Sequence, residues 1–132
     1  MLKKMNILRR FSVQSPFGRS GEDIAVQFLR DIGFVIVARN VANPTGRRLG
    51  EIDIVARDGH CLVFVEVKTR SASDMPLGLS IQTEKLRRLG KIGEWYIKQG
   101  NLANQSYRFD MVGVVVVDGM KPNITHIRDI FL

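Results

Sequence analysis

The sequence predicts an α/β protein with a mixed β-sheet of about five strands flanked by helices. Two segments carry apolar residues at helical spacing, and several others show the alternating or continuous apolar patterns of strands. These segments follow one another as helix, three strands, helix and two strands. This order favours a sheet with helices on its faces over an all-helical or all-strand protein.

The first predicted helix spans residues 21–32, with Ser20 as its N-cap, Asp23 in the capping-box position and Gly33 as its stop. Residues 34–39 then read as a strand. Residues 40–50 contain Asn-Pro and two glycines and are predicted to form a loop, in which Arg47 and Arg48 are either phosphate contacts or solvated charges.

A β-hairpin follows. Residues 51–57 alternate polar and apolar side chains, Asp58-Gly59 is a strong two-residue turn signal, and residues 62–69 form the return strand. The return strand is apolar at nearly every position, so we expect it to be buried on both faces.

The second half begins with a loop at residues 70–79, followed by a long helix at 82–99 that ends at Gly100. A β-branched run at 109–117 predicts another buried strand. Asp118-Gly119 turns the chain into a last strand at 124–127.

Composition limits the class of protein. The chain has 132 residues, 45% hydrophobic and 25% charged, which suits one globular domain. We expect a flexible basic arm at residues 1–17 and a single domain at 18–132. No apolar run predicts a membrane span or a signal peptide. The one cysteine, Cys61, excludes an intrachain disulfide and fits a reducing, cytoplasmic setting.

The net charge is +7 and the isoelectric point is about 10.1. A surface this basic suits a polyanion such as DNA, but it also suits an acidic membrane surface, an acidic protein or no partner at all. Charge alone leaves these alternatives open.

The hairpin register brings charged residues together. With Asp58 and Gly59 as the two turn residues, Asp53 lies opposite Phe64 and Glu51 lies opposite Glu66. Asp53, Glu51, Glu66 and Lys68 then project from one face. Asp53 and Glu66 become diagonal neighbours, with Cβ atoms roughly 7 Å apart. That spacing allows both carboxylates to hold one hard cation.

Charges are costly in a strand made otherwise of Leu, Val and Phe unless they are paired or bind a metal. A salt bridge of Lys68 with Glu66 or Asp53 is one explanation, but it leaves one carboxylate uncompensated. A bound Mg²⁺ or Mn²⁺ explains all three charges, so the spacing predicts a metal site and leaves the salt bridge as its alternative.

The same residues resemble known patterns. Asp53 followed by Glu66-Val67-Lys68 resembles the PD-(D/E)xK nuclease signature, with Ile52 in place of the proline. The wider match is more specific. Gly21-Glu22, residues 50–59 (GEIDIVARDG), residues 63–70 (VFVEVKTR) and residues 108–110 (RFD) resemble the YraN-like family of bacterial proteins. The resemblance covers nearly all of the chain after residue 18.

That family is described as uncharacterised, or as candidate endonucleases similar in fold to archaeal Holliday-junction resolvases. The resemblance therefore implies a restriction-endonuclease-like fold and a metal-dependent DNA endonuclease, with Glu22 as a third acid of the metal site. From the residues alone Glu22 needs no such role, because the helix dipole favours an acid in the first turn. Glu51 remains open between a supporting and a solvent-facing role.

In the expected mechanism, Asp53 and Glu66 hold the cation, the carbonyl of Val67 adds a ligand, and Lys68 orients the attacking water or stabilises charge on phosphorus. The expected DNA contacts are made by basic residues of the loops and the long helix: Arg47, Arg48, Arg70, Lys85 and Arg88.

The expected function is DNA endonuclease activity, including activity on branched or structured DNA, with a homodimer expected if the substrate is a symmetric junction. Two alternatives remain. One is a nucleic-acid-binding module that does not cleave, and the other is a protein-interaction domain with a structural charge cluster. The three differ in whether a divalent metal binds and whether phosphodiester bonds break.

Overall fold

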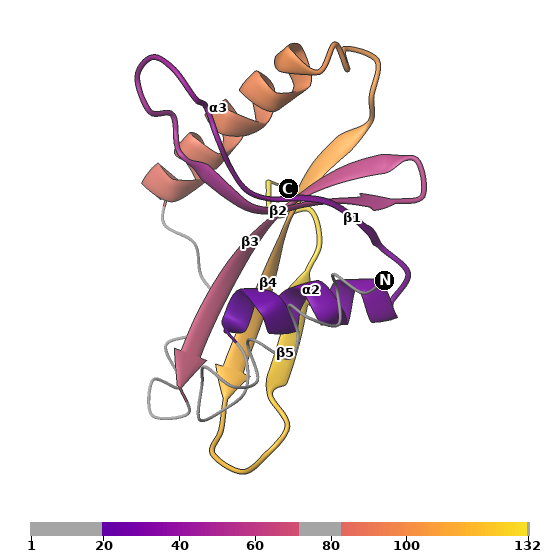
Figure 1. The fold of residues 1–132 in the computed structure, drawn as a ribbon, viewed down its shortest axis with the longest axis vertical. Coiled ribbons are helices and arrows are strands. Elements are labelled where there is room, and N and C mark those ends of the chain that lie inside the picture. Colours follow the sequence, from indigo (N-terminus) through magenta and orange to yellow (C-terminus); the bar gives the residue numbers. More distant parts are fainter. Residues whose placement is uncertain (1–19, 72–82, 132) are drawn as a thin grey trace.

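The architecture comes from a computed structural model that describes residues 20–71 and 83–131 (Figure 1). The basic arm expected at 1–17 and most of the loop expected at 70–79 lie outside the described residues. The elements, in chain order, are α2 (Gly21–Asp31), β1 (Val35–Ala42), β2 (Glu51–Asp58), β3 (Cys61–Ser71), α3 (Thr83–Gln99), β4 (Tyr107–Val116) and β5 (Asn123–Ile127).

The five strands form one mixed sheet in the order β1-β2-β3-β4-β5. Neighbouring strands are antiparallel except for β3 and β4, which are parallel and joined by the crossover that contains α3. The predicted α/β class is confirmed, and the sheet with its two helices is consistent with a restriction-endonuclease-like fold. Neither described helix is both long and apolar enough to cross a membrane.

The first helix begins where the sequence indicates. The side chain of Ser20 accepts a hydrogen bond from the backbone N–H of Asp23 at 3.2 Å, and its hydroxyl donates to the Asp23 carboxylate at 2.7 Å. The chain leaves the helix at Gly33, whose φ of +99° favours glycine. The N-terminal end of α2 is thereby fixed next to the sheet, which matters for the position of Glu22.

The expected hairpin register is wrong by two residues. Asp58 pairs with Cys61, so the two turn residues are Gly59 and His60 rather than Asp58 and Gly59. Of these two residues, Gly59 has a positive φ, +61°, and His60 does not, which is the pattern of a type II′ turn. In this turn the left-handed backbone conformation falls on the glycine, which adopts it without steric cost. Asp58 instead accepts a hydrogen bond from Arg108 at 3.0 Å.

The shift of two residues leaves the faces unchanged, because side chains alternate with a period of two. The paired register runs from Asp58 opposite Cys61 to Ile54 opposite Val65. The pairing of β2 with β3 ends at Ile54, one residue short of Asp53, and the Asp53 and Glu66 side chains line the same cleft.

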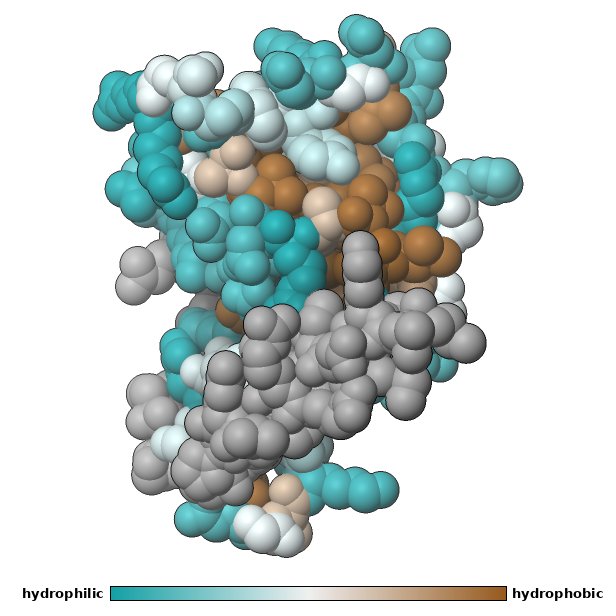
Figure 2. Space-filling model, viewed as in Figure 1, coloured by the Kyte–Doolittle hydropathy of each residue, from teal (hydrophilic) through white to brown (hydrophobic). Residues whose placement is uncertain are grey.

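Two apolar cores lie on the two faces of the sheet. The core beneath α2 contains Val63 and Val65, and the core beneath α3 contains Leu62 and Phe64. The alternation along β3 therefore separates the faces, as expected for a strand buried on both sides. Hydrophilic residues cover much of the surface in Figure 2, with a hydrophobic patch among them.

Strand β2 departs from this alternation at the site. Ile54 and Ala56 belong to the α2 core and Val55 to the α3 core, but Ile52 also belongs to the α3 core. The strand therefore bends between Ile52 and Ile54, next to the last paired position of β2 and β3. The two strands diverge beyond that point, and Asp53 lies at the divergence.

A buried ionic network fixes the far strands. Asp110 is fully buried and accepts hydrogen bonds from Arg108 at 2.9 and 3.1 Å, pairs with His126 at 2.8 Å, and accepts from the backbone N–H of Asp129 at 3.0 Å. Despite the opposing effect of burial, these partners lower the pKa of Asp110. Asp110 therefore links β4 to β5 and to the C-terminal segment that follows it.

Candidate active site

The site is built around the divergence of β2 and β3. Beyond Ile54 the two strands no longer pair, so the backbone N–H of Val67 needs another acceptor. Asp53 supplies it, since its Oδ2 accepts a hydrogen bond from Val67 N–H at 2.8 Å. The carboxylate of Asp53 thus holds the separated strands together and is itself held in one orientation.

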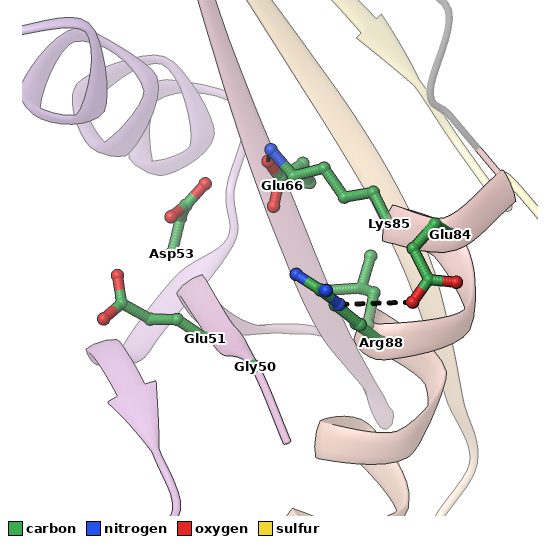
Figure 3. Close-up of a pocket in the computed structure, with 8 residues that line it drawn as sticks. Gly50, Glu51, Asp53, Glu66, Glu84, Lys85 and Arg88 are labelled. Atoms are coloured by element: carbon green, nitrogen blue, oxygen red, sulfur yellow. Dashed lines mark ion pairs between the residues drawn. The ribbon is translucent and has the colours of Figure 1, made fainter. Parts of the chain in front are cut away.

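Glu66 is the buried acid of the site. It lies on β3 with 4% of its surface exposed, on the same face as Phe64. Its Oε2 lies 2.6 Å from Nζ of Lys85, which reaches across from the first turn of α3 (Figure 3). The ion pair of Glu66 with Lys85 differs from the salt bridge considered in the sequence analysis, in which the cation was Lys68.

Asp53 and Glu66 face a cleft between the sheet and α3. Its volume is about 440 Å³. Figure 3 shows the carboxylates of Glu51 and Asp53 on one side of this cleft and Lys85 and Arg88 on the other. The lining residues are Gly50, Glu51, Asp53, Glu66, Glu84, Lys85, Arg88 and Leu89. The cleft is therefore acidic at the sheet and basic at the helix.

A second cleft opens toward α2 and shares Asp53, Glu66 and Lys85 with the first. Glu22 and Val67 line it as well. The structure therefore brings the three acids implied by the resemblance to one opening. Glu22, however, is paired with Arg39 at 3.4 Å.

Protonation of the acids reflects their crowding. Burial raises the pKa of Asp53 to about 6; the Val67 hydrogen bond and Lys85 oppose the rise, and Glu66 adds to it. Burial and the charge of Asp53 also raise the pKa of Glu22. A raised carboxyl pKa beside other acids indicates negative charge that the fold leaves partly uncompensated, as at many functional sites.

Lys68 follows Glu66 by two residues on β3 and is half-buried. Desolvation lowers the pKa of its ammonium, and so do the charges of Arg70 and Lys85, while Glu66 opposes them. Lys68 is therefore within electrostatic reach of the site. The two clefts described above are lined by Lys85 rather than by Lys68.

The expected DNA contacts divide into two groups. Arg47, Arg48 and Arg88 line a third cleft that shares Gly50 and Glu51 with the first, so basic side chains continue outward from the acids. Arg70 lies apart from all three clefts and donates to the carbonyl of Thr69 at 3.0 Å.

The donor set suits a hard cation. Mg²⁺ commonly uses one or two carboxylates and fills its remaining positions with water and substrate phosphate oxygens. Asp53 and Glu66 are two such carboxylates, and the carbonyl of Val67 belongs to the residue that follows Glu66. Within residues 20–71 and 83–131, no three His, Cys, Asp or Glu side chains form a group that could hold an ion alone.

Sequence reasoning missed two contacts. Arg39 on β1 pairs with Asp23 at 2.9 Å as well as with Glu22, and nothing in its local sequence signals this. Lys85 was expected to meet phosphate, and its contact with Glu66 was not foreseen. Both contacts depend on how separate elements pack, which local patterns do not encode.

Comparison with known proteins gives consistent results. A family model described as "Uncharacterised protein family UPF0102" matches residues 21–114. A UPF0102 protein of Geotalea daltonii is 40% identical over 116 residues, which cover 86% of this chain and 87% of the relative. A UPF0102 protein of Nocardia farcinica is 36% identical over 130 residues, which cover 95% and 96%.

The matched region contains α2, the hairpin with its two acids, α3 and most of β4. It therefore includes every acid of the site and the helix that supplies Lys85. The protein belongs to the uncharacterised family UPF0102, which is the YraN-like family that its motifs resemble.

Proposed function

We propose that this protein is a metal-dependent endonuclease that hydrolyses phosphodiester bonds in DNA, including branched or structured DNA. One observation carries the proposal. Two carboxylates, Asp53 and Glu66, face one cleft where β2 and β3 diverge, and basic residues surround that cleft. The motif resemblance points to the same residues.

The acids and the basic residues have separable tasks in this proposal. Asp53 and Glu66 would hold Mg²⁺ or Mn²⁺, with the Val67 carbonyl as a further ligand. When bound, such a cation lowers the pKa of a coordinated water and polarises the phosphoryl group. Lys68 would orient the attacking water or stabilise charge at phosphorus, and Glu22 would assist the metal site from α2.

Binding of DNA would rest on the basic residues next to the acids. Arg47, Arg48 and Arg88 line the third cleft, which is continuous with the first through Gly50 and Glu51. A phosphodiester backbone lying along this path would bring one phosphate to the acids and neighbouring phosphates to the arginines. Arg70 would contact DNA outside these clefts.

The second candidate is a DNA-binding module that does not cleave. The ion pair of Lys85 with Glu66 favours it, because an ammonium already neutralises one of the two acids. In that module the remaining acids would be structural, and affinity would depend on the basic side chains alone.

Cleavage of labelled DNA separates the two candidates. Duplex, flap and four-way-junction DNAs would be incubated with Mg²⁺ or Mn²⁺, and with EDTA as a control. The endonuclease proposal expects metal-dependent cuts that Asp53→Asn and Glu66→Gln abolish. Lys68→Ala should also abolish cleavage while retaining most of the DNA affinity, because many basic contacts share that affinity.

Substitutions in the basic surface test the proposed DNA contacts. Arg47→Ala with Arg48→Ala should weaken DNA binding and reduce its salt dependence, while the bound fraction is still cut. Salt-dependent binding without cleavage of any of these structures, in either metal, would leave the binding module as the better account.

A further inference from the structure

Lys85 occupies a position between two environments. Its ammonium is 2.6 Å from Glu66 Oε2, yet its side chain is 58% exposed, whereas the Glu66 side chain is 6% exposed. The lysine therefore approaches a buried carboxylate from the solvent side of the cleft (Figure 3). It is attached through a flexible stem to the first turn of α3.

The contact compensates charge that the sheet places there. Asp53, Glu66 and Glu51 all line the first cleft, and Lys85 contacts Glu66 directly. Arg88, the other cation of that lining, is engaged with Glu84 at 3.4 Å. Glu51 pairs with Arg48 at 3.2 Å, and Lys85 is the cation in contact with Glu66.

A divalent cation bound to Glu66 and this ammonium compete for the same carboxylate. Hard cations bind carboxylate oxygens directly, at distances that leave no room for an ammonium on the same lone pair. Release of Lys85 does not leave Glu66 uncompensated, because the bound cation replaces the ammonium and the exposed lysine returns to solvent. The freed side chain would remain in the cleft, where it could bind a phosphate.

We propose that Lys85 is an exchangeable counter-ion of Glu66: it neutralises the site without metal, a divalent cation displaces it, and the displaced lysine then contacts a DNA phosphate. The inference rests on the proposed metal site. It makes metal binding and DNA binding mutually reinforcing, because the cation releases a phosphate contact that is otherwise engaged internally.

The test uses Mn²⁺ binding to the whole protein without DNA, measured by calorimetry. Lys85→Met removes the ammonium and keeps an unbranched chain. Lys91→Met is the matched control, since Lys91 is an exposed lysine of the same helix that lines the third cleft and not the first. Both variants lose one positive charge from α3.

Lys85→Met should bind Mn²⁺ more tightly than the wild type by on the order of three- to fivefold. Lys91→Met should differ by less than about twofold, because it changes only the screened long-range field. If Lys85→Met binds Mn²⁺ no more tightly than Lys91→Met, the exchange is refuted, while Mn²⁺ binding by the wild type would leave the endonuclease proposal standing. Failure of all three proteins to bind Mn²⁺ would overturn both.

Fluorescence anisotropy with labelled duplex gives a second readout that does not depend on cleavage. Ca²⁺ prefers oxygen ligands, as Mg²⁺ does. When Ca²⁺ replaces EDTA, the plot of log DNA affinity against log salt concentration should become steeper by about one unit for the wild type. Lys85→Met should lack this gain, and Lys91→Met should retain it. Equal gains in all three proteins would refute the transfer of Lys85 to phosphate.

Discussion

Replacing Asp53 by asparagine should stabilise the protein without metal and destabilise it relative to wild type when metal is present. Asparagine keeps an oxygen that can accept the hydrogen bond of Val67 N–H, now 2.8 Å long. It removes the negative charge that crowds Glu66 and Glu51. The substitution therefore separates the structural contact of Asp53 from its charge.

The magnitude follows from the pKa of Asp53, which burial raises from 3.8 to about 6. A rise of about two units corresponds to at most about 3 kcal/mol of lost stability above pH 6. The side chain is only half-buried, so solvent screening reduces this to about 1–2 kcal/mol. For a domain of this size the gain in Tm is about 4–8 °C.

The sign depends on pH. Because the folded-state pKa is raised, the neutral carboxyl favours folding below about pH 4, and this contribution is lost as pH rises through about 6. Asp53→Asn should therefore match the wild type near pH 4 and exceed it increasingly up to pH 7. With Mn²⁺ at about 100 times its Kd, the free energy of unfolding of the wild type should rise by about 2.7 kcal/mol. The Asp53→Asn variant should lack most of this rise.

Thermal melts in EDTA and in Mn²⁺ across this pH range measure both effects. Asp118→Asn is the matched control, since Asp118 is exposed in the turn between β4 and β5. A metal-free Asp53→Asn protein less stable than the wild type by 1 kcal/mol or more at pH 8 would refute the reasoning. The carboxylate would then be a structural partner rather than an uncompensated charge.

Three further predictions concern the frame around the site. Gly93→Ala should lower the free energy of unfolding by about 1–3 kcal/mol in chemical denaturation, because the new Cβ would lie 2.5 Å from Phe109. Gly90→Ala should raise it by about 0.5–1 kcal/mol, because its Cβ would lie 3.6 Å from Phe131. Equal effects of the two substitutions would contradict this packing. Asp110→Asn should lower the free energy of unfolding by about 3 kcal/mol at pH 7. The loss should shrink below about pH 4, because the lowered folded-state pKa of Asp110 stabilises the wild type only above that pH. Denaturation curves that show the same loss at every pH would contradict this. Two residues inserted in the β2–β3 turn should leave the Mn²⁺ affinity unchanged in calorimetry. One inserted residue should be absorbed as a bulge at the turn, so that the protein still binds Mn²⁺. A folded protein that loses Mn²⁺ binding after the one-residue insertion would show that the register shifts instead.

Much of the fold follows from local sequence. Ser20 and Gly33 set the ends of the first helix, and the alternation along residues 51–57 predicts a strand, although Val55 is buried on the face opposite to Ile54. The nearly continuous apolar run of β3 places it inside the sheet, between β2 and β4. These features depend on neighbours in sequence, so composition and periodicity are sufficient to predict them.

Features that depend on packing between elements were not predictable in this way. The bend that places both Ile52 and Val55 in the α3 core comes from β2 leaving β3 and turning toward α3. The ion pair of Lys85 with Glu66 requires the position of α3 relative to the sheet. Neither arrangement has a sequence period, so pattern analysis alone gives no signal for them.

The hairpin shows why a register that is wrong by two residues can still predict that Asp53 and Glu66 lie in one cleft. Asp58-Gly59 and Gly59-His60 are both two-residue turns, so changing from one to the other moves the pairing by two residues and preserves the faces. Beyond Ile54 the two strands no longer pair, and the Asp53 carboxylate accepts a hydrogen bond from the backbone N–H of Val67. Burial of Asp53 at this point raises its pKa to about 6, and the charge of Glu66 adds to the rise. The same crowding makes a cation favourable at this point, so the separation of β2 from β3 is both the source of the electrostatic cost and the reason for expecting the site there.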